Sequence, residues 1–265
     1  MSDGLMKHAA LAECAALDAG KVILSFYRKE SSIETKTDGS PLTAADKAAH
    51  QAIVKHLSVS KFPVISEEGK VGAADGECYW LVDPLDGTKD FLAANDEFTV
   101  NIALIERGQP VLGVVYAPAL DELYVGIPGK FAWQVLHGAK TLCEQKPRSS
   151  TLRMATSRFH DHADASTFAT MNGIAVKVPI GSALKYGRLA MGKIDVYPRL
   201  VGTSEWDTAA GQAVLEAAGG CLLNWNTGEP VRYGKANRRN ERFIAFRSPY
   251  RTEEFKRTHY SEPLP

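Results

Sequence analysis

Residues 80–91 read WLVDPLDGTKDF, an apolar run followed by acidic and turn-forming residues. The apolar residues predict the end of a buried strand, and the proline, which fixes φ and lacks an N–H, predicts that the strand stops there. Asp83 and Asp86 flank that stop. Gly87 lacks a Cβ and permits close approach of a ligand, and a helix or turn beginning at Thr88 exposes N–H groups that can bind an anion. The stretch therefore offers carboxylates to a metal and N–H groups to a phosphate; a plain turn is the alternative.

Two further acidic segments extend this pattern. Glu67 and Glu68 follow the apolar run at 63–65 and are expected at another strand end. Asp207 begins a helical sequence that ends at Gly219-Gly220 as a C-cap would, and helix capping and metal binding are both open roles for it. The resulting set of oxygen ligands suits Mg²⁺, and no His or Cys accompanies it to indicate zinc: Glu67, Asp83, Asp86 and Asp207.

Helical and strand patterns alternate along the chain, which favours a layered α/β or α+β architecture. Helices are predicted over residues 1–28, 43–57, 182–192 and 207–218, and strands over 63–66, 79–82, 98–106, 110–118, 152–156, 175–179 and 243–246. The strands over 98–106 and 110–118 are joined across residues 107–109, and a strand-rich pattern continues over 123–136. Thr43 and Asp46 have the spacing of a capping box, which predicts a structural role for Asp46. The polar stretch at 143–151 predicts a boundary between an N-terminal half, 1–147, and a C-terminal half, 148–265.

The composition excludes several classes of protein. The 265 residues are 45% hydrophobic with a formal net charge of zero, which is typical of a globular chain of one or two domains and disfavours general nucleic-acid binding. No apolar run approaches the length of a membrane span, and the four cysteines are scattered without a C-x-x-C pair. The basic stretch at 235–242 is interpreted as a solvated loop. We therefore expect a soluble cytoplasmic protein.

Three motifs together resemble those of the lithium-sensitive, magnesium-dependent phosphomonoesterases, a family that includes inositol monophosphatases and fructose-1,6-bisphosphatases. In the family's order and spacing they are Glu67-Glu68, Asp83-Pro84-Leu85-Asp86-Gly87-Thr88 and Trp206-Asp207-Thr208-Ala209-Ala210-Gly211. The chain is most similar to the CysQ-type 3′(2′),5′-bisphosphate nucleotidases of this family, because its GTKDF at 87–91 is close to their GTKEF, with Asp90 as a departure. The GSALK segment at 181–185 and the YPR segment at 197–199 also resemble that branch.

The resemblance implies a fold and a catalytic centre. The implied fold is α+β, a five-layer αβαβα sandwich. The implied cofactor is Mg²⁺, two or three ions, with Asp83 bridging two of them and the ligands being Glu67, Asp83, the Leu85 carbonyl, Asp86 and Asp207. Asp46 and Thr88 are implied to orient and deprotonate the attacking water, with Glu67 also counted among the catalytic residues, so Asp46 acquires a role beyond helix capping.

Substrate contacts are expected on two sides of the site. Those at the scissile phosphate are Glu67, Leu85, Asp86, Gly87, Thr88 and Asp207. A second phosphate is expected at Gly181, Ser182 and Lys185, where N–H, hydroxyl and ammonium groups lie near a predicted helix start, and Arg199 can add a bidentate contact.

The implied reaction is hydrolysis of the 3′-phosphate of adenosine 3′,5′-bisphosphate to AMP and phosphate by a metal-activated water, with inhibition by Li⁺. An inositol monophosphatase or other sugar-phosphate phosphatase is one alternative, and a non-catalytic metal- or nucleotide-binding regulator is another. A Ser/His/Asp mechanism is not supported because G-x-S-x-G is absent. The predicted partner is a small nucleotide, the predicted state a monomer or homodimer, and peripheral association with the inner membrane stays open.

Overall fold

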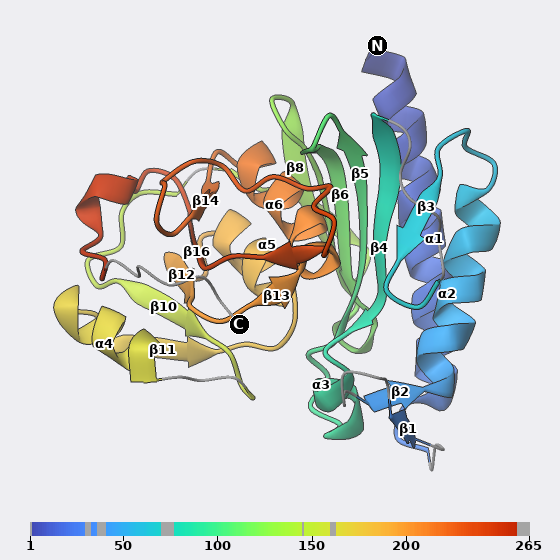
Figure 1. Cartoon of the computed structure of the whole chain (residues 1–265), viewed down its shortest axis with the longest axis horizontal. Helices are drawn as coiled ribbons and strands as arrows, with labels where there is room; N and C mark the ends of the chain where they lie inside the picture. The colour runs from blue at the N-terminus through green and yellow to red at the C-terminus, as the bar shows by residue number, and fades with distance from the viewer. Residues whose placement is uncertain are drawn as a thin grey trace.

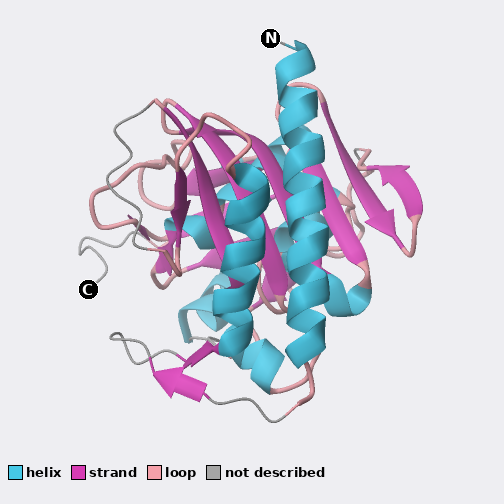
Figure 2. Cartoon of the chain, turned by 90° about the vertical axis from the view of Figure 1, so that its right-hand side faces the viewer, coloured by secondary structure: helices cyan, strands magenta, loops and turns pink. Residues whose placement is uncertain are grey.

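The computed structural model describes residues 2–29, 33–35, 41–69, 77–144, 146–159 and 163–258. Two helices, α1 (Ser2–Phe26) and α2 (Ala44–Leu57), pack side by side across one face of a seven-stranded sheet (Figures 1 and 2). The strand order follows the chain from β3 to β9, with β3 parallel to β4 and every other pair antiparallel. These strands are β3 (Val64–Ser66), β4 (Cys78–Asp86), β5 (Thr99–Glu106), β6 (Gln109–Ala117), β7 (Glu122–Ile127), β8 (Phe131–Leu136) and β9 (Ala139–Leu142).

A second sheet lies on the other side of helices α5 (Leu184–Ala190) and α6 (Ala209–Ala217), as Figure 1 shows. Its order is β11 (Val176–Pro179), β10 (Arg153–Thr156), β12 (Val196–Arg199), β16 (Phe243–Phe246) and β14 (Cys221–Asn224). The first three strands are parallel, and β16 is antiparallel to both of its neighbours. Helix α4 (Ala163–Met171) covers the outer face of this sheet, which completes five layers and confirms the predicted αβαβα sandwich.

Shorter elements join these layers. They are β1 (Ile33–Thr35), β2 (Pro41–Thr43), α3 (Thr88–Leu92), β13 (Thr203–Ser204), β15 (Arg239–Asn240) and the 3₁₀ helices η1 (Pro118–Leu120), η2 (Glu205–Asp207) and η3 (Thr252–Glu254). β1 pairs with β2, and β13 pairs with β15. None of the helices in the described part of the chain combines the length and apolarity needed to cross a membrane.

Three hydrophobic clusters hold the layers together. One lies between α1, α2 and the seven-stranded sheet and contains Trp80 and Val82; another surrounds α5 and α6 and contains Tyr79 and Leu81. β4 is therefore covered on both faces, which explains why its sequence is continuously apolar rather than alternating. The third cluster lies under α4. The cluster around α5 and α6 includes residues from both sides of position 147, and the division of the chain there stays a prediction.

The structure corrects two local predictions. β4 does not stop at the proline but continues to Asp86 through a β-bulge, in which the three steps from Asp83 to Asp86 face two steps of β5, from Asn101 to Thr99. A bulged position leaves an unpaired backbone group, so a residue without an N–H fits there. Asp207 does not begin α6; it is the last residue of η2, and its carboxylate accepts the Ser204 N–H at 2.8 Å.

Other predicted helix boundaries are confirmed. Thr43 and Asp46 form the capping box of α2. Thr88 begins α3 directly after Gly87, whose φ of +85° lies in the left-handed region. Gly219, with φ +82°, follows the C-cap of α6.

Candidate active site

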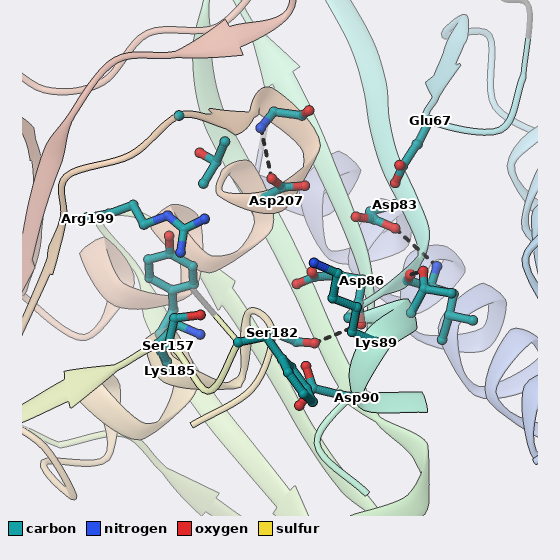
Figure 3. Close-up of a pocket in the computed structure, with 18 of the residues that line it drawn as sticks. Glu67, Asp83, Asp86, Lys89, Asp90, Ser157, Ser182, Lys185, Arg199 and Asp207 are labelled. Atoms are coloured by element: carbon teal, nitrogen blue, oxygen red, sulfur yellow. Dashed lines mark hydrogen bonds between the residues drawn. The ribbon is translucent and has the colours of Figure 1, made fainter. Parts of the chain in front are cut away.

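A pocket of about 430 Å³ opens where the carboxyl ends of strands from both sheets meet. β3 and β4 run parallel and bring Glu67, Asp83 and Asp86 to one edge. β10 and β12 run parallel in the other sheet and bring Ser157 and Arg199 to the facing edge. In layered α/β folds, ligand sites usually lie just beyond the carboxyl ends of the strands. Figure 3 shows side chains from both edges pointing into the same space.

The first edge carries the acids. The Glu67 N–H donates to the Val82 carbonyl at 3.2 Å, which fixes the residue after β3 beside β4. Asp83 is 2% exposed, and one of its oxygens accepts the Leu85 N–H at 3.1 Å across the bulge. The bulge thus turns successive carboxylates of β4 toward the pocket while the strand remains part of the sheet.

Asp86 lies at the junction between the two edges. One of its carboxylate oxygens accepts the Ala183 N–H at 2.7 Å and the Asn101 amide at 3.2 Å. The Ser182 hydroxyl donates to the Asp86 carbonyl at 2.7 Å. A Cβ at Gly87 would lie 2.1 Å from that hydroxyl oxygen, so the close approach of the two loops depends on the glycine.

Asp83, Asp86 and Asp207 each offer a carboxylate oxygen, and these atoms all lie within 4.8 Å of one another. Burial, followed by repulsion from Asp86 and Glu67, raises the pKa of Asp207 to about 8. Burial also raises the pKa of Asp86, although Lys185 opposes this shift. Repulsion among these buried and partly buried carboxylates is relieved by a cation, and the all-oxygen donor set suits a hard divalent ion such as Mg²⁺. The residues present therefore fit the predicted metal.

The second edge carries cations. Lys185, in α5, is only 5% exposed, and its ammonium donates to the Ile180 carbonyl at 2.8 Å. Burial lowers the pKa of Lys185 to about 8, although the nearby Asp86 carboxylate opposes this shift. At the end of β12, the Arg199 Nε is buried and has no hydrogen-bond partner within the described residues. Burial opposes the charge of Arg199, but Tyr197 and Asp207 raise its pKa overall.

Nearly all of the predicted site residues line this pocket. They are Glu67, Asp83, Leu85, Asp86, Gly87, Thr88, Ser182, Lys185, Arg199 and Asp207. Asp46 and Gly181 are not among the lining residues: the Asp46 carboxylate accepts the Thr43 N–H at 2.8 Å and the Thr43 hydroxyl at 2.6 Å, and the Gly181 N–H donates to the Glu97 carboxylate at 2.9 Å. The structure thus brings ten of the predicted residues together in one pocket, and the role of each stays a prediction.

Several lining residues were not predicted, among them Ser157, Phe159, Tyr197 and Arg239. The rule that located the acids, a residue directly after an apolar strand, also locates Ser157. Arg239 belongs to the basic stretch at 235–242, which is less solvated than predicted: Lys235 and Arg238 lie 2.9 and 3.1 Å from the carboxylate of Glu205, a fully buried residue. This contact holds the loop against η2, which precedes α6.

The five layers and the carboxylate cluster define a class of layered α+β protein with an acidic pocket suited to a divalent cation. Residues 6–252 match the inositol monophosphatase family. The 3′(2′),5′-bisphosphate nucleotidase CysQ of Escherichia coli strain K12 is 42% identical over 225 residues, which are 82% of this chain and 90% of that protein. The crystal structure of CysQ from Bacteroides thetaiotaomicron is 37% identical, with a TM-score of 0.81 over 92% of this chain and 98% of that chain. An inositol monophosphatase from Anabaena is 28% identical, with a TM-score of 0.73 over 92% and 91% of the two chains.

The chain therefore belongs to the inositol monophosphatase family, and it is a phosphatase.

Proposed function

We propose that this phosphatase removes the 3′-phosphate of adenosine 3′,5′-bisphosphate in a Mg²⁺-dependent reaction that yields AMP and phosphate. The observation that carries the proposal is the opposition, across one pocket, of a carboxylate cluster and two cationic side chains, Lys185 and Arg199. A substrate with two phosphates can use both edges at once, whereas a monophosphate uses only one. The name of the Escherichia coli relative, a 3′(2′),5′-bisphosphate nucleotidase, agrees with this division.

The carboxylates of Asp83, Asp86, Asp207 and Glu67, with the Leu85 carbonyl, would hold the metal. When bound, Mg²⁺ neutralises charge on the phosphate and makes a coordinated water more acidic. The chain's own contribution is to keep the carboxylates in place before binding. Asp86 is fixed by Ala183 and Asn101, and Asp207 by the Ser204 N–H.

In the reaction, a water oxygen forms a bond to phosphorus as the bond from phosphorus to the 3′ oxygen breaks. The water must lose a proton, and we assign its removal to Thr88 and Asp46. The Thr88 hydroxyl lies in the pocket, 3.4 Å from the Leu85 carbonyl. Asp46 is 1% exposed at the start of α2, and the adjoining strand β2 packs against α3, the helix that Thr88 begins. A proton can pass from the water to the Thr88 hydroxyl while the hydroxyl's own proton passes to the Asp46 carboxylate. The departing 3′ oxygen takes up a proton from solvent, which yields the 3′ hydroxyl of AMP.

Lys185 and Arg199 would hold the 5′-phosphate while the 3′-phosphate reacts. With a pKa near 8, Lys185 is mainly protonated at neutral pH and has donors beyond the one given to Ile180. The buried Nε of Arg199 lacks a partner within the described residues, and a phosphate oxygen would satisfy it.

The experiment that tests this function measures phosphate release from adenosine 3′,5′-bisphosphate, inositol 1-phosphate and fructose 1,6-bisphosphate, with Mg²⁺ and with a chelator. We expect the nucleotide to give the highest kcat/KM, and we expect the chelator to remove turnover of all three. A higher kcat/KM for inositol 1-phosphate would assign the chain to the alternative, an inositol or sugar-phosphate phosphatase. Full activity in the chelator would refute the metal dependence.

A further inference from the structure

Phe159 is an aromatic side chain exposed at a pocket that is otherwise mostly polar. It is 44% exposed, and it is the only exposed Phe or Trp among the described residues. It lines the same pocket as the carboxylates and as Lys185 and Arg199. The acids and the cations account for two phosphates of a nucleotide, and neither group offers a surface to the base. An exposed ring beside them is suited to stacking on a planar base.

The neighbouring Arg158 explains how Phe159 is held at the pocket. The Arg158 guanidinium pairs with Glu97 and donates to the Pro179 carbonyl at 3.4 Å, and its Nε lies 3.8 Å from Asp90. Ser157 and Phe159, the residues on either side, both line the pocket. Residues 158 and 159 form a bend directly after β10, and the contacts of Arg158 with Glu97 and with the Pro179 carbonyl fix this bend between the two lining residues.

We propose that Phe159 stacks on the purine base and selects nucleotides over base-free sugar phosphates. This inference rests on the proposed function, because it requires a nucleotide in the pocket. An inositol phosphate has no planar π face and gains little from the same ring. Phe159 is thus a specificity-determining residue, separate from the groups that hold either phosphate.

The test compares Phe159→Ala with the wild type on two substrates: adenosine 3′,5′-bisphosphate and its base-free analogue, methyl ribofuranoside 3,5-bisphosphate. Since base stacking on an aromatic contributes about 1–3 kcal/mol, we expect kcat/KM for the nucleotide to fall roughly 5- to 150-fold, mainly through KM. The base-free analogue should change less than about twofold. Phe159→Trp keeps a stacking surface and should retain activity on the nucleotide. Leu142→Ala, at a 56% exposed residue of β9 that does not line the pocket, is the matched control.

The results distinguish the stacking role of Phe159 from the proposed nucleotidase activity on which that role rests. A selective loss on the nucleotide, with an unchanged unfolding midpoint, supports the stacking role. Equal losses on both substrates, or no loss on the nucleotide, overturn it while the proposed function stands, provided that the wild type prefers the nucleotide to inositol 1-phosphate. If the wild type prefers inositol 1-phosphate, the proposed function fails, and the assignment of Phe159 fails with it.

Discussion

The two sheet edges that meet at the pocket differ in charge and in how they are made. The edge of the seven-stranded sheet presents carboxylates on β4 and directly after β3, and the edge of the five-stranded sheet, with α5, presents Arg199 and Lys185. Burial, followed by repulsion from the neighbouring acids Asp86 and Glu67, raises the pKa of Asp207 to about 8. Burial lowers the pKa of Lys185 to about 8, although the Asp86 carboxylate opposes this shift.

This difference shows what each edge lacks. A cluster of buried and partly buried carboxylates is stabilised by a cation, and buried and partly buried cationic donors are stabilised by an anion. The edges are also joined directly, because Ser182 and Ala183 donate to Asp86. The pocket is therefore arranged for a ligand that is itself divided, with a metal-bound phosphate at one edge and a second phosphate at the other.

The largest effect is expected from removing one charge of the acidic edge, in Asp83→Asn. The substituted side chain keeps an oxygen that can accept the Leu85 N–H, so we expect the β-bulge to be retained. Because the substitution removes metal binding that contributes several kcal/mol, turnover should fall by about 10³-fold or more. The measurement is phosphate release at saturating Mg²⁺ together with thermal unfolding. Asp164→Asn, in the first turn of α4 and away from the pocket, is the matched control. Near-wild-type turnover of the Asp83 variant would remove Asp83 from the metal site.

A smaller, selective effect is expected at the cationic edge from Lys185→Met, which keeps the apolar stem and removes the charge. Because a charge-assisted hydrogen bond contributes about 1.5–3 kcal/mol, kcat/KM for adenosine 3′,5′-bisphosphate should fall roughly 10- to 150-fold. Adenosine 3′-monophosphate lacks the second phosphate. Its kcat/KM should fall only by the amount that the attraction between Lys185 and Asp86 contributes. Lys177→Met, at an exposed residue of β11, is the control. Equal losses on both substrates would show that Lys185 does not bind the second phosphate.

The acidic edge could be predicted from sequence more completely than the cationic one. Glu67, Asp83 and Asp86 each come at or after an apolar run, so strand ends alone indicate their proximity. The bulge at Asp83–Asp86 was missed, because a proline signals the end of a strand unless the partner strand accommodates an extra residue. The sequence predicted Asp207 at the start of α6, whereas it ends the preceding 3₁₀ helix, η2. A helix of three residues is too short to show a periodic pattern in the sequence.

The cationic edge depends on how the second sheet docks against the first. Phe159 and Arg239 reach the pocket through packing between segments that are distant in sequence, and no local pattern encodes that packing. The ion pairs of the buried Glu205 with Lys235 and Arg238 could not be predicted from local sequence either, because they join residues about 30 positions apart. They attach the basic stretch to the rest of the fold. Sequence therefore predicts the layers and the acids, whereas the rim of the pocket is a property of the tertiary structure.

The two edges should also respond oppositely to pH in the metal-free protein. The pKa of Asp207 is higher in the folded state than its ordinary 3.8, so the folded state holds more protons and stability should fall as pH rises from about 4 to 8. The pKa of Lys185 is lower than its ordinary 10.5, so the unfolded state holds more protons and stability should rise between about 8 and 10.5.

Thermal midpoints measured from pH 5 to 10 with a chelator test this reversal, and Mg²⁺ should raise the midpoint by several degrees more at pH 8 than at pH 5. Asp207→Asn should flatten the lower limb, and Lys185→Met the upper one. A midpoint that is independent of pH, or a Mg²⁺ effect that is larger at pH 5, would contradict the assigned charge states.

The smallest expected effect comes from Ser182→Ala, which removes one contact between the edges and no charge. The Ser182 hydroxyl donates to the Asp86 carbonyl at 2.7 Å, and a net contribution of about 0.5–1.5 kcal/mol is typical of such a bond. The Ala183 N–H still holds the Asp86 carboxylate, so the metal affinity should change little. Ser58→Ala, which removes an exposed hydroxyl-to-carbonyl bond of 2.8 Å at the end of α2, is the control and should cost less. Urea unfolding with and without Mg²⁺ measures both variants. If Ser182→Ala is no more destabilising than the control, the Ser182 hydroxyl adds no net stability to the junction of the two edges. If the substitution weakens Mg²⁺ binding strongly, the hydroxyl also helps to position the metal ligands.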